Sequence, residues 1–325
     1  MPISTREVKN RQRSIFNIRQ VTKAMEMVSA SKMRKAQMIA LRTRPYAYKA
    51  LEMLSHLTAE EIDQEIGNTG NIFIAPKNAS PAELLRNPKG KVLIVAITSD
   101  KGLIGGLNAN VMKETLAIVR QYQKQDTLVE LILVGEKSKA SFQRLGVPIE
   151  KVFTGAGDYA TTEQTMPIAE LIRNRYEAGW VSRVVVVYSE FISTLKQRVT
   201  HRLYLPVTAK ILNDVINDII PQTGKFSELR NEEYATEKTM PDFTYEPNKQ
   251  ELISTLVPFF LDLYLYHIIL ESNASEHSAR MVAMKSASDN AKNLLDTLTL
   301  TYNKARQAAI TREISEITAG VEAMK

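Results

Sequence analysis

Apolar residues recur at helical spacing at both ends of the chain, whereas the middle alternates between short apolar runs and polar stretches. Over residues 4–57 this pattern predicts one long helix, because the segment has no Gly, its only Pro is Pro45, and strong helix formers are frequent. Alternating three- and four-residue steps mark a partly apolar stripe for packing on another helix. The stripe contains Val8, Arg11, Ile15, Ile18, Thr22, Met25, Ser29, Lys32, Ala36 and Ile39, widened by Val21, Val28 and Met33.

A second and longer helix is predicted over residues 259–322, with Pro258 at or just before its start and Gly320 near its end. At the usual rise per residue it would be about 95 Å long, too long to be buried in one compact domain. Its stripe contains Phe260, Leu263, His267, Leu270, Ala274, His277, Met281, Met284, Ser288, Ala291, Leu295, Leu298, Tyr302, Ala305 and Ala309. Apolar residues near its end need a surrounding surface: Ala308, Ala309, Ile310, Ile314 and Ile317.

The middle of the chain reads as strands alternating with helices, which is typical of a mainly parallel sheet covered on both faces. Strands are predicted at residues 92–98, 128–134, 149–153 and 184–188, helices at 108–123, 136–145 and 161–178, and an exposed antiparallel edge strand at 196–205. The fold class is therefore α/β. A compact domain between two long helices brings their ends together, so the helices are expected to form an antiparallel coiled coil.

The expected domain plan has five parts. They are an N-terminal coiled-coil helix (1–58), a loop-rich insertion (59–90), a Rossmann-like α/β domain (91–205), an insertion or linker with a possible helix at 209–219 (206–248), and a C-terminal coiled-coil helix (249–325).

Charge and composition narrow the classes of function. Residues 1–49 contain twelve Lys or Arg and two acids, whereas residues 249–325 are nearly balanced, so an anionic partner is expected near the N-terminal helix. The absence of cysteine excludes disulfides, thiolate zinc sites and cysteine nucleophiles. No run approaches 18 consecutive apolar residues, and the start resembles neither a secretory signal nor a transit peptide, so neither a membrane span nor a targeting segment is expected.

The feature closest to an enzyme site is the glycine-rich stretch from Ser99 to Asn108, between a predicted strand and a predicted helix. Glycines there could direct backbone N–H groups at a phosphate, and Glu136 takes the place of a ribose-binding acid. The spacing is G-x-x-G-G, however, which is not the dinucleotide fingerprint. The segment 135–138 likewise lacks the first glycine of a phosphate loop. A tight turn that permits close packing is the favoured interpretation.

The histidines do not form a metal site. His267 and His277 lie ten residues apart on one helical stripe, too far apart to share an ion, and His56 and His201 are isolated in the sequence. No nucleophile-elbow pattern is present. No catalytic, cofactor-binding or metal-binding residue is therefore assigned.

Long stretches of both terminal helices resemble one family. The segment 20–37, reading QVTKAMEMVSASKMRKAQ, is similar to the N-terminal helix of the gamma subunits of F-type ATP synthases. The segment 274–285, reading ASEHSARMVAMK and followed by Asp289 and Asn290, is similar to the C-terminal signature, as is 302–314, reading YNKARQAAITREI. The turn from Gly102 to Asn108 resembles a motif of the family's central domain.

The resemblance implies a non-catalytic rotor in the central stalk of a proton-transporting ATP synthase. Such a subunit transmits torque between the c ring and the alpha/beta hexamer during ATP synthesis. The implied partners are the alpha, beta, epsilon and c-ring subunits, without nucleic acid. No cofactor of its own is implied, since ATP, ADP and Mg would be bound by alpha and beta. The implied location is peripheral, on the cytoplasmic face of a bacterial cell membrane.

The resemblance also assigns contact residues. Arg306, Gln307 and Thr311 would meet a loop of beta, and Met25 with Lys23, Arg34 and Lys35 would meet an acidic lever segment of beta. Asp242, Tyr245 and Glu246 resemble a foot region near the c ring. Residues 206–248 lie where photosynthetic gamma subunits carry a regulatory insert, but the cysteine pair of the land-plant form is absent.

Two other classes remain open from the residues themselves. One is a nucleotide-binding α/β enzyme with coiled-coil arms, which would bind ATP or NAD. The other is a nucleic-acid-binding coiled-coil protein, which would retain DNA or RNA in a salt-sensitive manner through residues 1–49.

Overall fold

The computed structural model describes residues 5–63, 72–74, 90–207, 246 and 248–324, and between residues 44 and 63 it describes only the helical backbone. The chain divides into two compact units. One contains Met1–Ala30 with Arg280–Lys325, and the other contains Ser31–Ala279. The helix expected at 209–219 lies outside the described residues.

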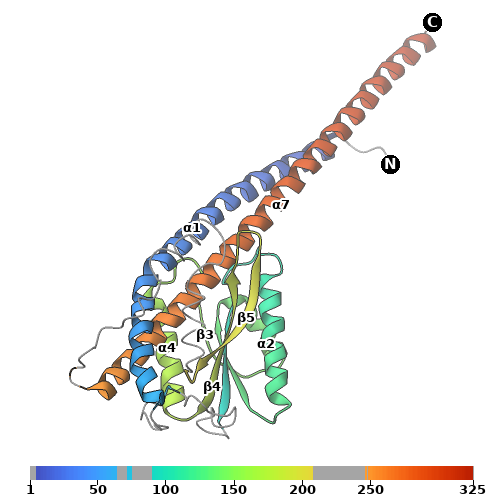
Figure 1. The fold of residues 1–325 in the computed structure, drawn as a ribbon. Helices are drawn as coiled ribbons and strands as arrows, with labels where there is room; N and C mark the ends of the chain where they lie inside the picture. Colours follow the sequence, from blue (N-terminus) through green and yellow to red (C-terminus); the bar gives the residue numbers. More distant parts are fainter. Residues whose placement is uncertain (1–4, 64–71, 75–89, 208–245, 247, 325) are drawn as a thin grey trace. The chain divides into compact units, whose positions relative to one another are not determined.

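Two long helices, α1 (Thr5–Asp63) and α7 (Lys249–Ala323), form the ends of the chain, as predicted (Figure 1). Helix α7 begins ten residues earlier than the predicted residue 259, and Pro258 lies inside it. Asn248 explains the earlier start, because its Oδ1 accepts a hydrogen bond from the backbone N of Glu251 at 2.9 Å. An Asn followed three residues later by a Glu is an N-cap signal that the apolar spacing alone did not reveal.

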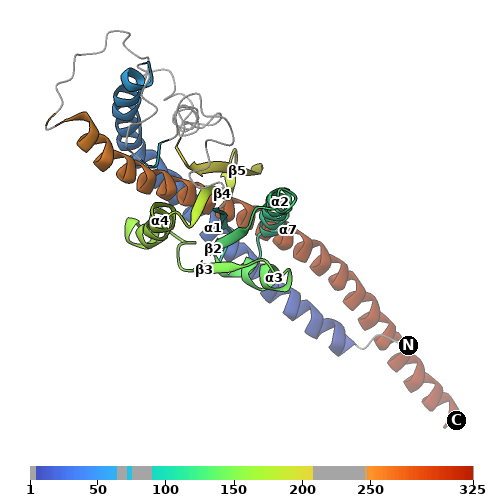
Figure 2. The ribbon, with the colours of Figure 1, turned by 90° about the horizontal axis from the view of Figure 1, so that it is seen from below.

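In the first unit, the two helices run antiparallel and side by side (Figures 1 and 2). The side chain of Gln12 donates from Nε2 to Oγ1 of Thr299 at 3.1 Å, which fixes their register. The predicted stripe of α7 is confirmed from Met281 to Ala305, since each of its positions is at least partly buried while most residues between them are exposed. Ala309 is exposed, so the stripe ends before it.

The predicted stripe of α1 is confirmed at most of its positions. The buried or partly buried members are Val8, Ile15, Thr22, Met25, Ser29, Lys32, Met33, Ala36 and Ile39. The prediction is wrong at Arg11, Ile18, Val21 and Val28, which are exposed, and it omits the partly buried Gln12, Arg19 and Glu26. Apolar side chains occur on both sides of this helix, so hydrophobicity alone did not separate all exposed positions from buried ones.

The second unit contains a five-stranded sheet in the order β3-β2-β1-β4-β5. Strands β1 (Lys91–Ile97), β2 (Val129–Val134), β3 (Ile149–Phe153) and β4 (Val181–Phe191) pair in parallel, whereas β5 (Gln197–Leu205) pairs with β4 antiparallel. This confirms the predicted α/β architecture with its antiparallel edge strand.

Helices cover both faces of the sheet (Figure 2). Side chains alternate along a strand, so Leu93, Val95 and Ile97 of β1 face the core shared with α4 (Thr162–Glu177) and α7. Val92, Ile94 and Ala96 face α2 (Leu107–Gln123) and α3 (Lys139–Arg144), which follows the short 3-10 helix η1 (Glu136–Ser138).

Helix α7 contains a stretch that is long and apolar enough, by length and composition alone, to cross a membrane, although none was expected from unbroken apolar runs. A buried helix in a protein core can have the same length and composition. In this chain, Phe260, Leu261 and Leu265 are at most 1% exposed and belong to the core on the sheet. Tyr204 of β5 reaches this helix, donating its hydroxyl to the carbonyl of Leu261 at 2.8 Å. The apolar stretch therefore has a partner inside the chain.

Candidate functional site

The glycine-rich turn between β1 and α2 is closed by its own side chains. Asn108, in the first turn of α2, accepts from the backbone N of Ser99 at 3.1 Å and donates to its hydroxyl at 2.8 Å. Gly135, after β2, has a φ of +101°, and a Cβ there would lie 2.2 Å from the carbonyl oxygen of Thr98. Gly135 thus permits close packing of two strand ends. Close packing does not explain the glycines of the turn itself, because a Cβ on Gly102 or Gly105 would meet no atom within 4 Å, and Gly105 instead has a φ of +60°.

Asp100 occupies the edge of the sheet where parallel α/β folds usually bind ligands. Its carboxylate accepts from the backbone N of Gly155 at 2.9 Å and from that of Glu136 at 3.2 Å. These are amides that a phosphate would otherwise use, and the negative charge of Asp100 opposes a phosphate there. Glu136 is exposed, and its nearest charged partner is Lys139 at 3.5 Å.

The loop between β3 and α4 (residues 154–161, the β3–α4 loop) collects further polar contacts that sequence reasoning missed. Asp158 pairs with Lys32 of α1, Oδ1 to Nζ, at 2.7 Å, and its Oδ2 lies 3.6 Å from Nζ of Lys101. The hydrogen bond from Lys32 lowers the pKa of Asp158, and the positive charges of Lys32 and Lys101 add to this effect against the opposing effect of burial. The sequence feature that could have indicated these contacts is the run Gly-Ala-Gly-Asp at 155–158, between a predicted strand and a predicted helix.

Two histidines make contacts within the chain. His277 is 1% exposed, with Nε2 3.3 Å from the carbonyl oxygen of Asp158, so it takes a buried polar position. His201, which has no histidine near it in the sequence, has its Nδ1 2.9 Å from Oε1 of Glu114 on α2. Within the described ranges, no three His, Cys, Asp or Glu side chains are grouped to hold a metal ion.

The predicted contact residues on α1 fall into two groups. Lys23 is exposed and pairs with Glu26 at 3.0 Å, with Met25 half-buried beside them in the first unit. Arg34 and Lys35 belong to the second unit and are exposed, with Nζ of Lys35 4.1 Å from the centre of the Tyr159 ring. Lys35 is therefore engaged in a contact within the chain.

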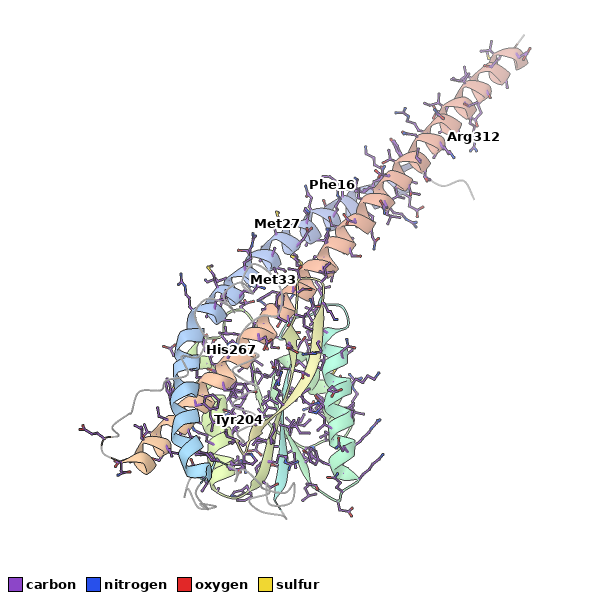
Figure 3. All side chains as sticks on the ribbon, viewed as in Figure 1. Phe16, Met27, Met33, Tyr204, His267 and Arg312 are labelled. Carbon is purple, nitrogen blue, oxygen red and sulfur yellow. The ribbon has the colours of Figure 1, made fainter. Side chains whose placement is uncertain are left out.

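Exposed apolar side chains accompany the basic residues of α1 in the first unit. Phe16 is 48% exposed and Met27 61% exposed, and both are labelled in Figure 3. Between residues 6 and 26 the helix carries six Lys or Arg and two Glu. Both glutamates pair within α1, Glu7 with Arg11 at 2.9 Å and Glu26 with Lys23. A basic excess therefore remains on this part of the helix.

The end of α7 (residues 306–323) is exposed wherever its side chains are described. The three predicted contact residues Arg306, Gln307 and Thr311 lie together here, with the Thr311 hydroxyl donating to the carbonyl of Gln307 at 2.9 Å. Ile314 is 59% and Ile317 67% exposed. Arg312, labelled in Figure 3, lies on the same segment.

The predicted foot residues are only partly described. Glu246 is exposed, whereas Asp242 and Tyr245 lie outside the described residues.

The family model described as ATP synthase matches residues 4–324 of the chain. A relative named ATP synthase gamma chain, from Roseiflexus castenholzii, is 38% identical over 99% of this chain and 98% of its own length. The chain belongs to the ATP synthase gamma chain family. Another gamma chain, from Nitrosomonas eutropha, is 36% identical over 99% of both chains. As a gamma chain, it is a subunit of an enzyme complex.

Chains in solved structures of ATP synthases share the fold. A chain of the Euglena gracilis mitochondrial ATP synthase, solved as OSCP/F1/c-ring, has a TM-score of 0.60 and 17% identity over 98% of this gamma chain and 94% of its own length. A chain of the Tetrahymena thermophila mitochondrial ATP synthase, from the central stalk and c ring, has a TM-score of 0.53 and 22% identity over 82% of this chain and 99% of that one. At this identity the likeness concerns the fold alone.

Proposed function

We propose that this gamma chain is the central-stalk rotor that transmits torque between the membrane c ring and the alpha/beta hexamer of a proton-translocating ATP synthase. The observation that carries the proposal is the end of α7. Ile310, Ile314 and Ile317 are 47%, 59% and 67% exposed along about two consecutive turns, and no described residue of the chain covers them. A helix with so many exposed apolar side chains requires a surface supplied by other proteins.

A rotor must give the catalytic sites different contacts as it turns, because only a difference in interaction energy can shift a conformational equilibrium. Two surfaces of this chain can supply such contacts. Arg306, Gln307 and Thr311 would meet a loop of beta. Met25 with Lys23, Arg34 and Lys35 would meet an acidic segment of beta, and the basic excess of α1 has the complementary sign.

The chain itself would be non-catalytic. ATP, ADP and Mg would be bound by the alpha and beta partners, and Asp100 occupies the sheet edge at which a nucleotide would otherwise bind. Epsilon and the c ring would complete the set of partners, with Asp242, Tyr245 and Glu246 proposed near the c ring. The rotor would be peripheral, on the cytoplasmic face of the bacterial cell membrane.

Affinity purification of the tagged chain from native membranes tests the proposal. Alpha, beta, epsilon and c subunits should co-purify and the preparation should hydrolyse ATP. Their absence from the eluate would exclude the rotor function. Tight binding of ATP or NAD by the isolated chain in equilibrium dialysis would instead support a nucleotide-binding enzyme.

A second test addresses the surface on α1. Met25→Lys adds a positive charge at a half-buried position that the proposal places against beta. Proton pumping per ATP hydrolysed should fall, because the altered contact changes the energy of rotor positions, while the fold remains intact by circular dichroism. Normal coupled rotation would remove Met25 from the contact surface. Lys113→Met, on the exposed face of α2, is the matched control.

A further inference from the structure

We propose that the β3–α4 loop is the joint that makes the sheet and the two long helices turn as one body, with Lys32, Asp158 and Asn273 as its positioning residues. The inference rests on the proposed rotor function. It concerns contacts within the second unit, where segments of α1, α7 and the sheet all reach this one loop.

Helix α7 holds the loop by its backbone. Asn273 donates from Nδ2 to the carbonyl of Ala156 at 2.7 Å, and Nε2 of His277 lies 3.3 Å from the carbonyl oxygen of Asp158. Both side chains are almost fully buried, at 3% and 1% exposure. Ala156 is itself 4% exposed and belongs to the core shared with α7. The loop is thus tied to α7 where water does not compete for the hydrogen bonds.

Helix α1 holds the same loop by its side chains. Nζ of Lys32 lies 2.7 Å from Oδ1 of Asp158, and Nζ of Lys35 lies 4.1 Å from the centre of the Tyr159 ring. Tyr159 is also 5.9 Å from Nζ of Lys32. One turn of α1 therefore makes an ion pair and cation–π contacts with two consecutive residues of the loop.

The sheet supplies the third attachment. Asp100, just after β1, accepts from the backbone N of Gly155, and Lys101 approaches Asp158 at 3.6 Å. A Cβ on Gly157 would lie 3.2 Å from Oδ2 of Asp100 and 3.6 Å from Oε2 of Glu276 on α7. The absence of a side chain at Gly157 lets the sheet edge and α7 approach the loop from two sides.

The chemistry of these contacts suits a joint that transmits force between the elements it connects. Apolar packing of α7 on the sheet favours burial but is not directional, so the polar contacts supply the directional part of the attachment. Hydrogen bonds weaken steeply when their geometry changes, so they resist a displacement of one element along another. The hairpin after β4 is a weaker candidate. Ser278 donates to the carbonyl of Thr194 at 2.7 Å, but the described contacts of that hairpin connect it to α7 and not to α1.

The test measures the stiffness of the rotor in the assembled complex. The sequence has no cysteine, so Lys113→Cys on the exposed face of α2 provides a single attachment point for a rotation probe. With the hexamer immobilised and the complex stalled, the angular variance of the probe reports the compliance between hexamer and sheet. Asn273→Asp combined with Asp158→Asn should raise this variance about twofold, because two directional contacts are lost while the side-chain volumes are kept.

Three comparisons separate this joint from a general loosening of the fold. Asp158→Glu keeps the negative charge that pairs with Lys32. Its angular variance should therefore be close to that of the original complex and below that of the double variant. His201→Gln, which breaks the Glu114 pair between β5 and α2, should leave the variance unchanged. If the double variant does not assemble, Lys32→Met is used in its place. It removes the ion pair between α1 and Asp158 without changing a residue of the loop, and it should raise the angular variance by itself.

Unchanged variance in assembled Asn273→Asp/Asp158→Asn or Lys32→Met complexes would overturn the inference, as would an equal rise in His201→Gln. Failure of the proposed function has a different signature. In that case the probe on the otherwise unaltered chain would not turn when ATP is added, whatever the variants do.

Discussion

The two halves of α7 differ in how deeply their side chains are buried. Between Ile253 and Ser278 the helix is buried on the sheet, with many side chains below 2% exposure, and polar residues bond to the loops after β3 and β4. Between residues 306 and 323 the described side chains are all exposed, including several isoleucines. One continuous helix thus changes from a core element into a surface without a partner among the described residues.

This difference separates two roles of apolar residues. In the first half, apolar side chains stabilise the chain itself, so substitutions there should change the free energy of unfolding. In the last turns they contribute little to that free energy, because folding removes little of their surface from water. Their selection is explained by assembly with other subunits.

The largest expected effect is on stability in the buried half. Phe260 is 1% exposed and stacks on Tyr264 with ring centres 5.9 Å apart. Phe260→Ala should lower the free energy of unfolding by about 3–5 kcal/mol, from lost burial and the cavity left behind. Urea unfolding of the purified chain, followed by circular dichroism, measures this. A loss below about 1 kcal/mol would mean that α7 is not a core element there.

A smaller effect is expected from the ion pair of the β3–α4 loop. Lys32 lowers the pKa of Asp158 below its ordinary value of 3.8, so the folded state binds a proton less readily than the unfolded state. The stabilisation is therefore complete above the unfolded pKa and is lost as the pH falls through the folded pKa. The side chain of Asp158 is 45% exposed, so the contribution should be below about 1 kcal/mol.

Comparing the original chain with Asp158→Asn gives the measurement. The difference in unfolding free energy between them should be constant from neutral pH down to about pH 4 and should shrink below it. A difference that grows on acidification would contradict the assignment. Arg198→Gln, which removes an exposed pair with Glu190, is the control for general charge effects.

The smallest effect on stability is expected at the exposed end of α7. Ile314→Ser should change the free energy of unfolding by less than about 0.5 kcal/mol, because the side chain is already 59% exposed. The same variant should weaken assembly or lower the rate of ATP-driven rotation, measured on the purified complex. A large loss of stability with normal rotation would reverse the roles assigned to the two halves of α7.

The order and type of the strands could be predicted from sequence because the central strands contain short apolar runs and β5 alternates polar and apolar residues, although β4 extends beyond the predicted 184–188 to Val181–Phe191. Val92 to Ile97 is an example, buried on both faces and recognisable without any partner. The stripe of α7 was also predictable, since polar residues separate its apolar positions in the first unit. The apolar spacing placed the start of α7 at residue 259, although the domain boundary was drawn at 249, because Asn248 caps the helix through one side chain rather than through periodicity.

Part of the packing face of α1 and the contacts of the β3–α4 loop could not be predicted from the sequence, for another reason. Ile18 and Val28 are apolar yet exposed, while Gln12 and Glu26 are partly buried, so the pattern of α1 mixes two packing surfaces. The contact of Lys32 with Asp158 joins residues far apart in the chain. Neither local spacing nor composition indicates such a pair.

The cover that α7 gives to one sheet face has a consequence for biosynthesis. The strands end at Leu205, but the helix that buries Leu93, Val95 and Val186 is synthesised last. Until residues 253–270 leave the ribosome, the part of this sheet face that α4 does not cover is an open apolar surface, of the kind that aggregates or binds chaperones. Truncation before α7 would therefore yield an insoluble chain rather than a smaller folded domain.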